Sequence, residues 1–287
     1  MKLINVYFLI FTFLYAPFSI RAGEEQRKAD SLYRTGAFYE ASVEYERCYY
    51  FADSPVLRCQ AILGKANCLK QLGEYGKAAA RLAQAPLQGL EDTLAFQLQY
   101  QMAFCQYLAA DFQTANGLLA DLRLRYVQPE LLVQTEFLQF LLWNELRQYD
   151  SAELTAVRYV KLRYTDPFHA NGILRILEQH YDQQNLPHLK NANSAVWMSR
   201  IVPGLGQTWL GHPGEGAVNF VLNAASLGLG IFGVVSGYPI TGYFLGTGFL
   251  QKFYFGGINR TKYLSQKVNY QRAKRFNDKS RAMILNL

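Results

Sequence analysis

Apolar residues recur at intervals of three and four along most of residues 24–165. The runs YQMAFCQYLAA and LLVQTEFLQFLLW show this spacing, and neither contains a proline. Such spacing is typical of helices that bury one face. Short stretches with proline and polar residues, such as ADSP, APLQ and VQPE, separate the runs and mark connections between them. The pattern therefore predicts an all-α fold for this part of the chain.

One short pattern returns four times at a constant spacing. The segments TGAFYEAS, LGEYGKAA, AADFQTAN and LRQYDSAE align without gaps at intervals of 37 residues. Each contains an aromatic residue with an alanine three positions later, and in the first three a small residue lies two positions before the aromatic. These positions are Gly36, Phe38 and Ala41; Gly73, Tyr75 and Ala78; Ala110, Phe112 and Ala115; and Arg147, Tyr149 and Ala152. A spacing held over four copies predicts a repeated structural unit.

The residue types of the pattern are those of a helix–turn–helix unit. The small residue ends the first helix, the aromatic residue fills the gap between the two helices, and the alanine lets the second helix pack closely. Further upstream, Ala29, Ala66 and Ala103 fall in register, whereas Phe140 takes the fourth place. We therefore expect about four helix pairs in residues 23–190, with FHANGILRILEQHYDQQ as a capping helix.

The order of small residue, aromatic residue and alanine resembles the tetratricopeptide repeat family over about residues 24–165. The usual length of that repeat is about 34 residues, so the units here are slightly longer. The resemblance implies a helical solenoid whose concave surface binds a protein or peptide. The alternative is that the array serves only as a spacer or an assembly face, because fold alone does not decide function.

A long stretch without charge follows the repeats. Residues 216–251 contain no charged side chain, and SGYP interrupts them near the middle. One helix across a bilayer needs about 20 apolar residues. The stretch therefore predicts a transmembrane hairpin of two helices over residues 216–257, with its turn near Gly237, Tyr238 and Pro239. The alternative is a hairpin buried in a soluble core.

Several residues of this hairpin suggest how it packs. Small residues recur four positions apart, which favours close approach of helices in lipid and self-association; the pairs are Ala224 and Gly228, Gly233 and Gly237, and Gly242 and Gly246. Asn219 and Asn223 are expected to face a partner helix. Trp197 and Trp209 are expected at the membrane interface, and Lys252 is expected to snorkel from a helix end.

The residues before the hairpin carry a second resemblance. SRIVPGLGQTWLGHPGEG contains neither GKS nor GKT, the glycine, lysine and hydroxyl sequence that a phosphate-binding loop needs, so we expect residues 191–215 to form an interfacial linker. Over about residues 195–275 the chain resembles an uncharacterised bacterial membrane domain with a PGxGQ motif. That domain is similar in outline to the TM2 hairpin, and it occurs behind tetratricopeptide-like repeats and sometimes beside membrane-protein-insertion-efficiency-factor domains. The matching positions are Pro203, Gly204, Gly206, Gln207, Trp209, Gly211, Gly256 and Gly257.

The first residues are typical of a secretory signal. Lys2 precedes the apolar run INVYFLIFTFLYAPFSI, and Arg21, Ala22 and a polar stretch follow it. We expect a signal peptide over residues 1–22, with an uncleaved membrane anchor as the alternative. A cleaved signal would place the repeats outside the cytoplasm, on the periplasmic side of a bacterial inner membrane.

The net excess of positive charge lies in the last third of the chain. The net charge is +7, yet residues 191–287 hold ten Lys or Arg against Glu215 and Asp278, which gives +8 for this part. Basic loops prefer the cytoplasm, so the basic tail of residues 258–287 conflicts with an exported hairpin. Nucleic-acid binding is not expected, because aromatic residues are sparse in this tail and no RNA-binding motif accompanies them.

The sequence offers little chemistry. The four histidines lack the spacing of a helical zinc site, and no CxxC or catalytic triad pattern occurs. Cys68 and Cys105 are expected in the core of successive repeats, while Cys48 and Cys59 could either form a bridge or remain free. We therefore expect no catalytic, cofactor or metal site.

Three hypotheses for function follow. The first is a non-enzymatic, membrane-anchored scaffold of the bacterial cell envelope that binds a protein partner through its repeats. The second is a factor for membrane-protein biogenesis or insertion that acts through the hairpin. A small transporter or channel subunit is the weakest, because no ionisable residue precedes Lys252 in the spans.

Overall fold

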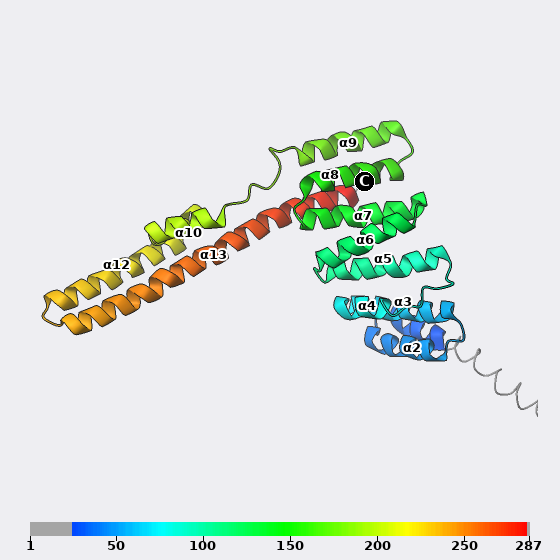
Figure 1. Cartoon of the computed structure of the whole chain (residues 1–287), viewed down its shortest axis with the longest axis horizontal. Helices are drawn as coiled ribbons and strands as arrows, with labels where there is room; N and C mark the ends of the chain where they lie inside the picture. The colour runs from blue at the N-terminus through cyan, green and yellow to red at the C-terminus, as the bar shows by residue number, and fades with distance from the viewer. Residues whose placement is uncertain (1–24, 286–287) are drawn as a thin grey trace, which may run out of the picture. The chain divides into compact units, whose positions relative to one another are not determined.

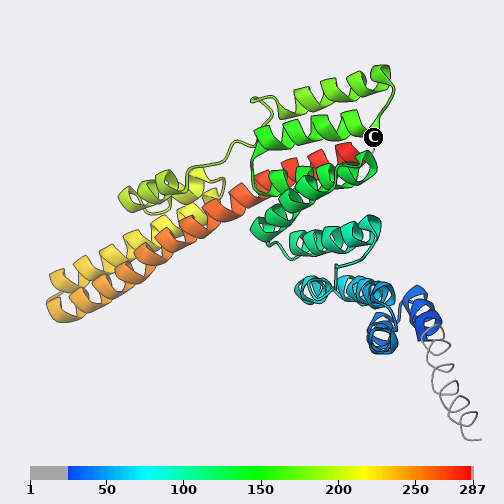
Figure 2. The same cartoon turned by 45° about the vertical axis from the view of Figure 1, so that its right-hand side comes forward.

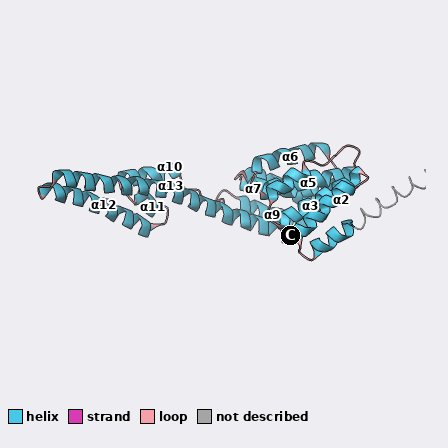
Figure 3. Ribbon diagram, turned by 90° about the horizontal axis from the view of Figure 1, so that it is seen from below, coloured by secondary structure: helices cyan, strands magenta, loops and turns pink. Residues whose placement is uncertain are grey.

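The computed structural model describes residues 25–285. Within these residues the chain is all-helical and contains no strand, so the predicted all-α class is confirmed (Figure 3). The chain divides between residues 179 and 180 into two compact units. The predicted signal peptide, residues 1–22, lies outside the described residues.

The first unit is a succession of helices. After a helical stretch over residues 25–34 come α2 (Phe38–Phe51), α3 (Pro55–Gln71), α4 (Tyr75–Leu82), α5 (Asp92–Leu108), α6 (Phe112–Arg125), α7 (Pro129–Glu145), α8 (Tyr149–Arg163) and α9 (Pro167–Tyr181), within whose last turn the division falls. From α2 to α8 each helix packs against the next one in the chain (Figure 2). The core therefore runs along the row of helices and is not collected at one centre.

Four corners in this unit share one backbone geometry. Gly36, Gly73, Ala110 and Arg147 all have positive φ, between 59° and 83°. At each corner the next residue donates its N–H to the carbonyl five positions back, as Ala37 does to Leu32 at 3.0 Å and Asp111 does to Gln106 at 2.9 Å. This bond and the left-handed residue define a Schellman helix end. The aromatic residue of each sequence segment then begins the next helix.

The alanines and the aromatic residues of the pattern differ in burial. The four alanines that follow the aromatic residues, and the upstream positions Ala29, Ala66, Ala103 and Phe140, are all fully buried. The aromatic residues Phe38, Tyr75, Phe112 and Tyr149 are only half-buried. Phe38 packs against Tyr33 and Phe112 against Tyr107, with ring centroids 5.4 and 5.8 Å apart. The aromatic residues therefore lie at the rim of the helix pair. The sequence pattern predicts them in the gap between the two helices, and this part of the prediction is not met.

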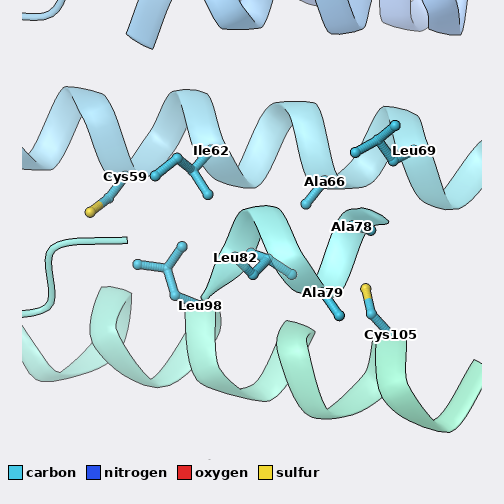
Figure 4. Close-up of a cluster of buried hydrophobic side chains, with 9 residues drawn as sticks. All are labelled: Cys59, Ile62, Ala66, Leu69, Ala78, Ala79, Leu82, Leu98 and Cys105. Carbon is cyan, nitrogen blue, oxygen red and sulfur yellow. The ribbon is translucent and has the colours of Figure 1, made fainter. Parts of the chain in front are cut away.

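Small and branched side chains fill the space between successive helices. Figure 4 shows one such cluster, in which Ile62 and Ala66 of α3, Leu82 of α4 and Leu98 of α5 point toward one another. Cys59 and Cys105 belong to the same cluster. All four cysteines are buried and free, so Cys48 and Cys59 are not bridged.

A glycine pair tests the corner geometry. Gly73→Ala is expected to lower the free energy of unfolding by about 1 kcal/mol, because an L residue at positive φ is strained. Gly76→Ala, three residues later inside α4, is expected to raise it by about 0.5–1 kcal/mol through helix propensity. Neither added Cβ meets a neighbouring atom, so backbone conformation alone separates them. Urea unfolding of the two variants measures both changes, and equal signs would contradict the corner assignment.

The second unit contains four helices besides the end of α9. These are α10 (Ala192–Ile201), α11 (Leu205–Trp209), α12 (Pro213–Val235) and α13 (Pro239–Leu285). α12 and α13 lie antiparallel and side by side along the whole of α12 (Figure 1). Gly237, with φ of 84°, forms the turn between them. Among the described helices, α12 is the one long and apolar enough to cross a membrane.

Two segments differ from their expected form. Residues 191–215, expected as a linker, contain α10 and α11, which pack on α12 and α13. The basic residues 258–285, expected as a separate tail, continue α13 without a break. Lys252 therefore lies inside a long helix and not at a helix end.

Candidate functional site

The PGLGQ motif forms a corner in which backbones meet without side chains between them. Gly204 has φ of 88°, and a Cβ on it would overlap the carbonyl of Gly216. A Cβ on Gly206 would overlap the carbonyl of Ala195 and the hydroxyl of Ser199. The glycines of the motif therefore allow α10, α11 and the first turn of α12 to pack in direct backbone contact.

Buried polar groups fasten this corner to α13. The Gln207 Nε2 donates to the carbonyl of Gly257 at 3.2 Å, and the hydroxyls of Ser199 and Thr261 lie 2.8 Å apart. The amide of Gly206 donates to the same Ser199 hydroxyl at 3.2 Å. Since all these groups are buried, their bonds hold α11 against α13 in one register. The glutamine of the motif thus has a structural role.

The eight residues that match the PGxGQ domain do not all lie in one site. Gly204, Gly206, Gln207 and Gly257 lie in the corner described above. Gly211 ends α11 with φ of 98°, and Gly256 faces open space. Trp209 lies at the surface under the Lys190 ammonium, whose Nζ is 4.5 Å from the ring centroid. Pro203 is half-buried just before the corner.

The seam between α12 and α13 is made of small and polar residues. The residues of α12 that face α13 follow one another at alternating steps of four and three; they are Asn219, Asn223, Ser226, Gly230 and Gly233. Gly216, three residues before them, faces α11 instead. A Cβ on Gly233 would overlap Gly242, and one on Gly246 would overlap Gly230. This 3.5-residue periodicity keeps one narrow face against a partner along a helix pair. The pairs of small residues four positions apart, considered in the sequence analysis, do not follow this periodicity. They wrongly predicted Ala224 and Gly228 in the interface, although both face outward.

The two asparagines lie in this seam, as expected. Asn219 Nδ2 donates to the carbonyl of Phe253 in α13 at 3.4 Å. Asn223 Nδ2 donates to the carbonyl of Asn219 at 2.8 Å. The Oδ1 of Asn223 is buried and accepts no hydrogen bond from the described residues. The interior of the helix pair is therefore more polar than its outer surface.

Charged residues gather near the end of the α12–α13 pair that lies away from the Gly237 turn, which we call the base of the pair. Arg260 forms a two-pronged ion pair with Glu215, with N–O distances of 2.7 and 2.9 Å. Lys252 has no anionic partner among the described residues. A cavity of about 570 Å³ opens beside them, lined by these three residues and by Gln207, Asn219 and apolar side chains of both helices. It is a candidate ligand site of this unit.

The first unit offers a different surface. Glu136 is almost fully buried between Arg123 and Arg158, whose Nε atoms lie 3.2 and 3.1 Å from its two oxygens. A groove of about 680 Å³ runs over this cluster, and Leu124 and Lys161 also line it. The groove therefore combines apolar surface with excess positive charge.

Nucleophilic chemistry has little support in the first unit. Burial raises the pKa of the Cys48, Cys68 and Cys105 thiols to about 11, so they stay protonated at neutral pH and react slowly. At the first helices of this unit, a hydrogen bond from Lys28 lowers the pKa of Glu44. The ion pair of Lys28 and Glu44 joins two helices.

Comparison with protein-family models, with curated proteins and with solved structures finds no match to this chain.

Proposed function

We propose that the protein is a non-enzymatic, membrane-anchored scaffold of the bacterial cell envelope. In this proposal α12 and the first part of α13 form a hairpin in the inner membrane, and the helical repeats hold a protein partner on the periplasmic side. The observation that carries it is the reversed polarity of the α12–α13 pair, which is small and polar inside and apolar outside.

The outer surface of the pair supports insertion in a bilayer. Large apolar side chains cover it on both helices, and many are more than half exposed, as are Phe232, Val235 and Phe244. A continuous apolar surface of this kind is unfavourable in water and marks a membrane or protein contact. Residues 216–235 of α12 carry no charge and measure about 30 Å along the helix, the thickness of a hydrocarbon core.

The second arm of the hairpin is shorter. In α13 the uncharged part, residues 239–251, measures only about 20 Å along the helix. Because this length is less than the thickness of the hydrocarbon core, the second arm crosses the bilayer only if Lys252 is surrounded by polar groups below the headgroups. The cavity at the base of the pair provides such an environment.

The repeats supply the partner-binding part. Four Schellman corners at 37-residue intervals and buried alanines in register support a tetratricopeptide-like solenoid in residues 23–190. Such arrays bind partners along their grooves. The groove with Arg123, Arg158 and Lys161 favours an acidic partner segment.

The scaffold is tested by photo-crosslinking in cells. A photoreactive residue in place of Leu124, which is highly exposed beside the groove, is expected to give one dominant protein adduct. Lys161→Glu should remove most of that adduct, because it reverses a charge in the groove. Arg125→Glu, also exposed but outside the groove, should not. Equal adducts in both variants would contradict binding in the groove.

A factor for membrane-protein biogenesis is the second candidate. It is favoured by the polar cavity next to apolar helix faces, where a passing polypeptide could be sheltered. The same photoreactive residue in place of Val218, which lines this cavity, separates the two functions. Adducts with many newly made membrane proteins at Val218, and none at Leu124, would favour biogenesis over the scaffold.

A further inference from the structure

The cavity at the base of the α12–α13 pair has two kinds of wall. Val218, Leu222 and Phe253 form an apolar side, while Gln207, Asn219 and Lys252 form a polar side. Its volume of about 570 Å³ lies within the range of pockets that hold small ligands. A ligand that fits both walls has a polar head and an apolar chain.

The polar wall carries one uncompensated positive charge. Glu215 and Arg260 neutralise each other through their two-pronged contact, so the Lys252 ammonium remains without a counter-charge among the described residues. α12 begins at Pro213 without a side-chain cap, and Gly214 of its first turn lines the cavity. The free N–H groups and the dipole of that turn add to the positive potential. The cavity therefore favours an anion.

A hydrogen-bond acceptor in the wall also lacks a partner. Gln207 is buried, and its Nε2 is used by Gly257, but its Oε1 accepts no bond from the described residues. A buried acceptor without a donor costs about 1–3 kcal/mol. A hydroxyl or ammonium group would satisfy it if the side chain turned toward the cavity.

The depth of Lys252 identifies the source of the anion. Arg260 pairs with Glu215 at the base of the helix pair, and Lys252 precedes Arg260 by eight residues of the same helix. This separation corresponds to about 12 Å toward the turn. In the membrane placement of the proposed function, on which this inference rests, the backbone of Lys252 lies below the headgroups among the acyl chains, and its long side chain extends back toward the phospholipid phosphates.

We propose that this cavity binds the headgroup of an anionic phospholipid, with the phosphate at Lys252 and the first turn of α12. The acyl chain lies on Val218, Leu222 and Phe253, and a small turn of the Gln207 side chain toward the cavity would bring its Oε1 to a glycerol hydroxyl of the headgroup. The bound lipid supplies the counter-charge that lets the short second arm of the hairpin place Lys252 below the surface.

The test uses the full chain purified in a neutral detergent. Thermal unfolding is followed during titration with phosphatidylglycerol, with phosphatidylcholine and with soluble glycerol phosphate. Phosphatidylglycerol is expected to raise the melting temperature at lower concentration than phosphatidylcholine, and glycerol phosphate should have little effect. Lys252→Gln should weaken the response to phosphatidylglycerol about tenfold. Lys262→Gln, exposed on α13 outside the cavity, should leave it unchanged.

Three results would overturn the lipid site. They are equal responses to the two lipids, an unchanged response in Lys252→Gln, and a response to glycerol phosphate as strong as that to the lipid. These outcomes are distinct from failure of the proposed function, in which the full chain would stay in aqueous solution without detergent.

Discussion

Phe140→Ala is expected to lower the free energy of unfolding by about 3–5 kcal/mol. Phe140 is 1% exposed in α7, at the position that alanines fill in the three earlier repeats. Its ring therefore occupies space that smaller residues leave in the other units, and truncation would leave a cavity that the packed helices cannot close. Such a loss approaches the total stability of many domains.

The measurement is urea unfolding of the full chain in detergent, followed by circular dichroism. Phe168→Ala is the matched control, because Phe168 is 90% exposed at the start of α9 and its loss should change stability by less than about 0.5 kcal/mol. Phe112→Ala should fall between the two, since that ring is half-buried. Equal effects at Phe140 and Phe168 would contradict the assignment of Phe140 to the core.

Local features of the first unit could be predicted from the sequence because their causes are local. The constant spacing of 37 located all four corners, since a helix end needs only a left-handed residue and the bonds of its neighbours. Small residues mark three corners, whereas Arg147 adopts positive φ without that signal. The depth of the aromatic residues was predicted wrongly, because it depends on the angle between helices, which spacing does not fix.

The second unit was predicted less completely because its decisive contacts join distant residues. The approach of Gly204 to Gly216 and the bond from Gln207 to Gly257 depend on how three helices meet. Glycines that permit a tight corner look the same in sequence as glycines of a linker. The position of Lys252 was misjudged for the same reason, since nothing near it shows that α13 continues to Leu285.

The seam of α12 is a different case, because its signal is present in the sequence. Small and polar residues recur at steps of three and four from Asn219 to Gly233, and mostly apolar residues fill the positions between them. The first unit has the opposite arrangement, with apolar residues inside. This reversal within one chain is the physical basis of the proposal that the α12–α13 pair, unlike the first unit, lies in a membrane.

Cysteine labelling tests the insertion of α12 most directly. Leu227 in the middle of α12 is 54% exposed, and Leu154 in α8 is 62% exposed. In water, Leu227→Cys and Leu154→Cys should react with N-ethylmaleimide at similar rates. In the proposed membrane placement, only the thiol at position 154 meets the water that its ionisation requires.

The experiment labels isolated membranes that contain the full chain and reads each position by peptide mass spectrometry, so that the four buried native cysteines are counted separately. Membrane insertion predicts labelling at position 154 and none at position 227 until the membranes are dissolved in denaturing detergent. Equal labelling of the two positions in intact membranes would contradict the assignment of α12 to the bilayer.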